Sequence, residues 1–147
     1  MPPFGTDPAR FTWERQAEWD GVAVGGTTAA SLQGIGDFFA SPYRIYAPRR
    51  INSRLEAATF AARAINAEDV SWEQGPPLTR PERTLIDLRL DSEDPSLIAD
   101  AYLDARDIGL DYERLGKLVR ETSATPKREK ALEPLAELMR AIPKGDR

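Results

Sequence analysis

The stretch LTRPERTLIDLRL, residues Leu78–Leu90, has the most regular pattern in the chain and decides the fold. Thr79 is followed three residues later by Glu82, which is the spacing of a capping box at the start of a helix. Pro81 falls in the first turn of such a helix, where its missing N–H costs little. Leucine and isoleucine follow at helical spacing. The stretch therefore predicts a scaffold helix that packs on a core through one apolar face.

Three further helices are predicted downstream, because each carries a start signal followed by apolar residues at helical spacing. Asp94 precedes a proline, Asp111 precedes an apolar stripe, and Thr125 precedes another proline, so each is a candidate N-cap. Gly109 is placed to close the first of these helices. Pro134 predicts that the last helix is kinked or begins late.

The first half of the chain has the pattern of short strands. Apolar and polar residues alternate over 43–47 and 70–72, and Val22–Val24 is a third, short candidate. Residues 55–65 are alanine-rich and fit either a helix or a strand. We favour a strand there because the segment follows a strand and a turn.

Thr27 or Thr28 is predicted to cap a short helix between the first two strands. The order of elements predicts an α+β fold, with a small antiparallel or mixed sheet of short strands in the first half packed by three to four C-terminal helices. We divide the chain into an irregular segment with a possible short helix (1–20), a single α+β domain (21–143) and a C-terminal tail (144–147).

Composition narrows the possible chemistry. The 147 residues include no histidine and no cysteine, which excludes zinc sites built on those ligands and Ser-His-Asp or Cys-His catalysis. Carboxylates at Asp91, Glu93 and Asp94 leave open a Mg²⁺ site of an enzyme, although two of them also suit a helix start. We predict no catalytic residue, no cofactor and no metal. Neither a membrane-spanning run nor a signal peptide is recognisable, so a cytoplasmic protein without membrane contact is expected.

Positive charge is concentrated in one part of an acidic chain. The net charge is −4, yet residues 41–63 hold five arginines and one glutamate. Arginine forks suit phosphate and carboxylate groups, but charges also protect a solvated strand edge. Arg80 and Arg83 are predicted on the outer face of the helix that follows Thr79. The candidate partner-binding residues are Arg44, Arg49, Arg50, Arg54, Arg80 and Arg83.

Three segments in order resemble one family. TTAASLQGIGD (27–37), YRIYAPRR (43–50) and GPPLTRPERTLIDL (75–88) are similar to the C-terminal domain of AbiEi-type antitoxins of type IV abortive-infection toxin–antitoxin systems. The Pro-Glu-Arg-Thr motif at 81–84 is the most specific of these features. The resemblance covers residues 22–119.

The resemblance implies a non-enzymatic antitoxin and repressor, with a nucleotidyltransferase-like toxin as its cognate partner and its own promoter as its DNA. Relatives usually carry an N-terminal winged helix, whereas about twenty residues precede Val22 here, so DNA contact is expected to be weak. Relatives also carry histidines where this chain has Gly25-Gly26 and Ala61-Ala62. Two alternatives stay open: a DNA-contacting regulator of its own operon, and a carboxylate-dependent Mg²⁺ nuclease or phosphotransferase.

Overall fold

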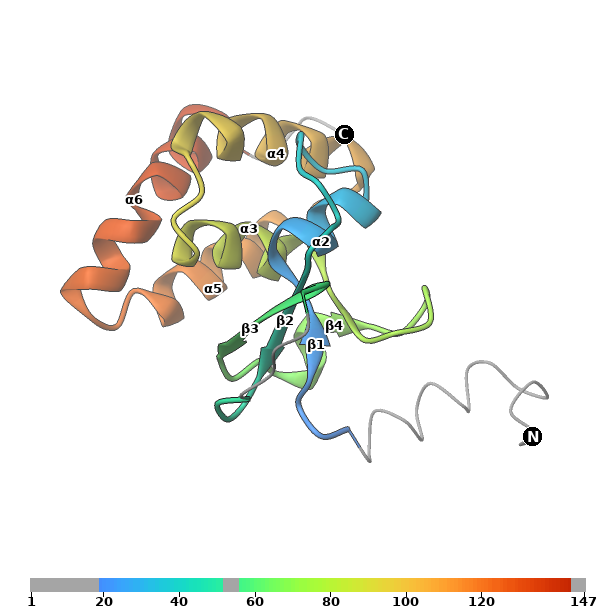
Figure 1. Ribbon diagram of the computed structural model, residues 1–147. Coiled ribbons are helices and arrows are strands. Elements are labelled where there is room, and N and C mark those ends of the chain that lie inside the picture. The colour runs from blue at the N-terminus through green and yellow to red at the C-terminus, as the bar shows by residue number, and fades with distance from the viewer. Residues whose placement is uncertain (1–18, 52–55, 144–147) are drawn as a thin grey trace.

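Five short strands form one mixed sheet in the first half of the chain (Figure 1). The computed structural model describes residues 19–51 and 56–143, so the helix expected within 1–20 lies almost wholly outside the described residues. No helix among the described residues is long and apolar enough to span a membrane. The strands are β1 (Ala23–Val24), β2 (Tyr43–Ala47), β3 (Ala58–Ala62), β4 (Val70–Ser71) and β5 (Leu78–Thr79).

The strand order is β3-β2-β1-β5-β4. The β2–β3 and β1–β5 pairs are parallel, whereas β1–β2 and β4–β5 are antiparallel. The β2–β3 pair is the longest, running from Tyr43 opposite Ala58 to Ala47 opposite Ala62. The prediction of a mixed sheet, and of a strand within the alanine-rich segment, is therefore confirmed.

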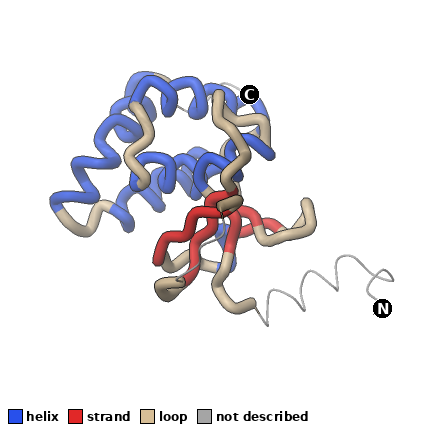
Figure 2. The backbone as a smooth tube through the Cα atoms, in the orientation of Figure 1, coloured by secondary structure: helices blue, strands red, loops and turns tan. Residues whose placement is uncertain are grey.

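Four helices follow the sheet, as predicted, and a fifth lies between β1 and β2. Figure 2 shows the helices gathered on one side of the strands. A short 3₁₀ turn, η2 (Ala67–Asp69), precedes β4. The helices are α2 (Gly26–Leu32), α3 (Pro81–Leu90), α4 (Pro95–Ile108), α5 (Tyr112–Thr122) and α6 (Pro126–Ala141).

The main apolar core lies between the helices, and α3 is at its centre. This helix contacts α2, α4, α5 and α6, and its Leu85, Ile86 and Leu88 are fully buried. A second, smaller cluster beside the sheet is built around Tyr46 and Trp72. Most of the stretch Leu78–Leu90 therefore forms the central scaffold helix, as its pattern predicts.

Three predicted N-caps are confirmed. Backbone amides donate to the side chains of Asp94 (from Ser96, 2.8 Å), Asp111 (from Arg114, 3.0 Å) and Thr125 (from Arg128, 3.2 Å). Gly109 ends α4 with a left-handed φ of 106°, a conformation that glycine adopts at little cost. These local signals fix the helix boundaries in the second half of the chain.

The capping box predicted at Thr79 is wrong. Thr79 is the last residue of β5, and its Oγ1 lies 2.8 Å from the Thr84 Oγ1. Arg80 is the N-cap of α3, without a side-chain cap bond. Glu82 instead accepts the Asp111 backbone amide at 2.9 Å. The Glu82 carboxylate, which the local pattern assigned to the start of α3, thus binds the start of α5 instead.

Two smaller predictions also need correction. Neither threonine caps α2, which begins at Gly26 after Gly25. Thr28 lies inside that helix and bridges to β2, accepting the Arg44 amide at 2.8 Å and donating to the Ala40 carbonyl at 2.7 Å. A late start of the last helix is wrong as well, because α6 runs through Pro134.

Candidate functional site

Six polar side chains at the junction of the sheet and α3 form one connected cluster, the arginine network. Two of its members lie on β2 and one directly follows β3. The other three lie in α3 and at its C-cap, at a spacing of four residues, which places them on one side of the helix. The members are Arg44, Tyr46, Arg63, Arg83, Asp87 and Asp91.

Asp91 is the carboxylate that joins the two strands to the C-terminal end of α3. Arg44 donates to it through Nε and Nη2, both at 3.0 Å, and Arg63 donates through Nη2 at 2.9 Å. The Tyr46 hydroxyl donates a further hydrogen bond. Burial alone would raise the pKa of Asp91, but the hydrogen bonds from Arg44 and Tyr46 outweigh it and hold the pKa below its usual range.

Asp87 is wholly buried and binds two guanidinium groups. Arg83 donates from Nε (3.1 Å) and Nη2 (3.0 Å), and Arg63 donates from Nη1 at 3.2 Å. Burial raises the pKa of the Asp87 carboxyl, while Arg83 and Arg63 oppose that rise. An ionised carboxylate without these partners would be costly at this position.

Tyr46 is the aromatic centre of the network. The Arg63 guanidinium lies 4.6 Å and that of Arg44 5.4 Å from its ring centroid, within the range of a cation–π interaction. Burial, together with the neighbouring carboxylates of Asp87 and Asp91, raises the pKa of the Tyr46 hydroxyl. The hydroxyl therefore acts as a hydrogen-bond donor.

The predicted partner-binding arginines separate into two groups. Arg44 and Arg83 belong to the arginine network, so the outer-face position predicted for Arg83 is wrong; its ion pair with Asp87 draws it inward. Arg49 and Arg50 are exposed just after β2. Arg80 is also exposed, and its Nε donates to the Glu68 carbonyl at 3.2 Å. Arg54 lies outside the described residues.

Arg63 is the one arginine of the network that was not among the sequence candidates. Its partners, Asp87 and Asp91, are 24 and 28 residues further along the chain, so no local pattern predicts these contacts. The spacing Arg83, Asp87, Asp91 was a usable signal, since side chains four residues apart on a helix are neighbours.

A groove of about 620 Å³ opens beside the network, between the end of β3 and helices α3, α5 and α6. We call it the basic groove, because four cations and one carboxylate line it: Arg63, Arg83, Lys127, Arg128 and Glu121. Hydroxyl and amide groups of Ser92, Thr122, Thr125 and Asn66 and small apolar side chains complete its wall. Pro48, next to the exposed Arg49, also lines it.

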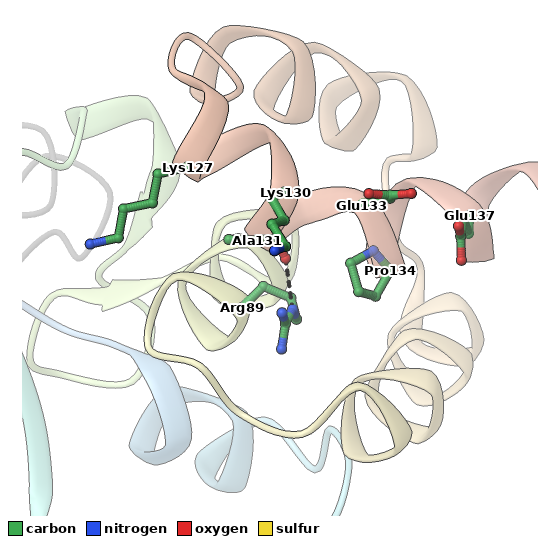
Figure 3. A pocket seen from close by; sticks show the side chains of 7 residues that line it. All are labelled: Arg89, Lys127, Lys130, Ala131, Glu133, Pro134 and Glu137. Atoms are coloured by element: carbon green, nitrogen blue, oxygen red, sulfur yellow. Dashed lines mark hydrogen bonds between the residues drawn. The ribbon is translucent and has the colours of Figure 1, made fainter.

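A second hollow of about 470 Å³ lies along α6 and has a mixed lining (Figure 3). Lys130, Glu133 and Glu137 give it both signs of charge. Arg89 from α3 points to the helix and donates to the Ala131 carbonyl at 2.7 Å. This arginine therefore serves to attach α3 to α6.

Two of the three carboxylates considered as cation ligands have structural partners. Asp91 is held by the network, and Asp94 caps α4 through the Ser96 amide. Within residues 19–51 and 56–143, no group of three or more potential acidic ligands is arranged to hold a metal ion. Asp91 and Asp94 therefore contribute to the scaffold.

Comparisons with known proteins bear on the fold. No protein-family model matches the chain, and a search of curated proteins gives no match. Among solved structures, the fold is similar to the crystal structure of the RV2827C protein from Mycobacterium tuberculosis, with a TM-score of 0.56 and 21% identity. The match covers 92% of this chain and 54% of that one, so this chain spans about half the length of that structure.

Proposed function

We propose that this chain is a non-enzymatic, antitoxin-like binding protein that neutralises a nucleotidyltransferase-like toxin of a bacterial toxin–antitoxin system. The observation that carries the proposal is the resemblance of segments 27–37, 43–50 and 75–88 to AbiEi-type antitoxins. In the fold these segments supply α2, β2, β5 and α3, and α2 contacts the other three elements. The resemblance thus concerns one contiguous part of the structure.

The charge distribution supports a protein partner of this kind. Arg49 and Arg50 are exposed, and neither forms an ion pair within the described part of the chain. A nucleotidyltransferase needs carboxylates to hold its metal ions, so such a toxin presents an acidic cleft. Opposite charges steer and orient two proteins during association.

Co-expression with a nucleotidyltransferase-like toxin tests the proposal. We expect the wild-type chain to restore growth and Arg49→Glu with Arg50→Glu to abolish rescue while circular dichroism shows a folded domain. Arg120→Glu with Arg140→Glu, at two exposed sites elsewhere, is the matched charge control and should still rescue. Failure of the wild-type chain to restore growth contradicts the proposed function.

A further inference from the structure

The basic groove contains guanidinium groups that are already fixed in place. Arg63 and Arg83 are both held by Asp87, which is wholly buried. Nη1 of Arg83 donates no hydrogen bond to any described residue, although Arg83 lines the groove. A donor held by its own ion pair loses little conformational freedom when it meets a carboxylate.

Lys127 and Arg128 occupy positions that helix stability does not explain. Both are exposed in the first turn of α6. The dipole of a helix disfavours positive charge at its N-terminus. Neither forms an ion pair within the described residues. The Lys127 ammonium and the Arg128 guanidinium therefore add positive charge to the groove rather than neutralising a nearby acid.

The groove also lies at the end of an open sheet edge. β3 is the edge strand, and β2 is its one partner among the described strands. Its last residue, Ala62, and the next residue, Arg63, both line the groove. An extended peptide that pairs with β3 would therefore lead directly into the groove, as in strand addition to an exposed edge.

The lining favours a peptide over nucleic acid. Single-stranded nucleic acid usually stacks its bases on aromatic side chains, and the groove lining contains no aromatic residue. Apolar side chains, cations and hydroxyl groups line it together, which suits a peptide with carboxylate side chains.

We infer that the basic groove and the edge of β3 that pairs with no described strand together bind an extended acidic segment of a protein partner. Backbone groups of that segment pair with β3, and its carboxylates meet Arg63, Arg83, Lys127 and Arg128. The inference rests on the proposed function for the identity of the partner, which would be the toxin, and adds the kind of segment that is recognised.

Direct binding of synthetic peptides to the full chain tests this inference. The probe is a blocked, fluorescent peptide of alternating threonine and glutamate, measured by fluorescence anisotropy. We expect it to bind at least about tenfold more tightly than its glutamine counterpart. Methylation of alternate backbone nitrogens, which removes the donors for strand pairing, should weaken binding by about the same factor.

Paired variants locate the site. Lys127→Gln with Arg128→Gln should weaken binding about tenfold, whereas the matched pair Arg120→Gln with Arg140→Gln, outside the groove, should leave it within about twofold. Circular dichroism checks folding of both.

The inference would be overturned if the acidic and glutamine peptides bound equally well, or if the methylated peptide bound as well as the unmethylated acidic peptide. Equal effects of the two variant pairs would overturn it too. Displacement of the peptide by a lower concentration of duplex DNA would also overturn it and assign the groove to nucleic acid. Because the assay contains no toxin, its result is independent of the growth rescue that tests the proposed function.

Discussion

The helical half of the molecule and the junction between the sheet and α3 are held together by different forces. Between the helices, fully buried side chains such as Leu85, Ile98 and Leu135 pack in an apolar core. At the junction, three arginines, two aspartates and a tyrosine form the arginine network. Apolar packing depends little on pH, whereas an ion network depends on the charge of each member. The difference provides ways to test which arginines are structural.

The largest effect is expected from Asp87, the wholly buried carboxylate of the network. Asp87→Ala leaves the guanidinium groups of Arg63 and Arg83 without their shared partner. Breaking a buried ion pair in this way should lower the free energy of unfolding by about 3–5 kcal/mol, measured by urea denaturation. Asp107→Ala, at an exposed position of α4, is the control. It should change the free energy of unfolding by less than about 0.5 kcal/mol. Similar values for the two variants would show that the network does not stabilise the fold.

The pH dependence should distinguish the two regions. The lowered pKa of Asp91 in the folded chain means that its stabilising contribution is complete above the unfolded pKa of about 3.9 and is lost as the pH falls through the folded pKa. The difference in unfolding free energy between wild type and Asp91→Asn should therefore shrink between about pH 7 and about pH 3.

An apolar substitution in the helical core is the control for that titration. Leu135→Ala should cost about 3 kcal/mol at either pH, because it removes buried methyl groups and leaves a cavity. Urea denaturation of the wild type, Asp91→Asn and Leu135→Ala across the pH range gives the difference in unfolding free energy for each variant. A constant difference for Asp91→Asn would mean that its charge contributes nothing to the network.

The helix caps should have a smaller effect. Asp94→Ala removes the side chain that accepts the Ser96 amide at the start of α4. A lower midpoint of thermal unfolding is expected because that hydrogen bond is lost, while Asp94→Asn should retain most of the stability. Equal losses for both variants would point to the charge rather than to the hydrogen bond.

Sequence patterns predicted the helical half well because its signals are local. Asp94, Asp111 and Thr125 cap the helices that follow them, and Gly109 ends one of them. The alternation within 43–47 likewise identified β2. Each of these features depends on residues that are a few positions apart, so it can be read without knowing the fold.

The junction was harder to predict because its contacts are distant in sequence. Arg44 and Asp91 are 47 residues apart, and arginine is usually exposed, so a surface position was the natural expectation. Thr79 and Glu82 have the spacing of a capping box, yet each is bound by another partner. Arg49 and Arg50, from the same positive segment, lie exposed after the end of β2, and no local feature identifies Asp91 as the partner of Arg44.

The central claim is that the arginines of this segment divide into structural members and exposed ones. Urea denaturation of Arg44→Gln and Arg50→Gln under identical conditions tests it most directly. Arg44→Gln should lower the free energy of unfolding by about 2 kcal/mol, because it removes charge-assisted hydrogen bonds to Asp91. Arg50→Gln should change it by less than about 0.5 kcal/mol. Equal effects of the two substitutions would contradict the division.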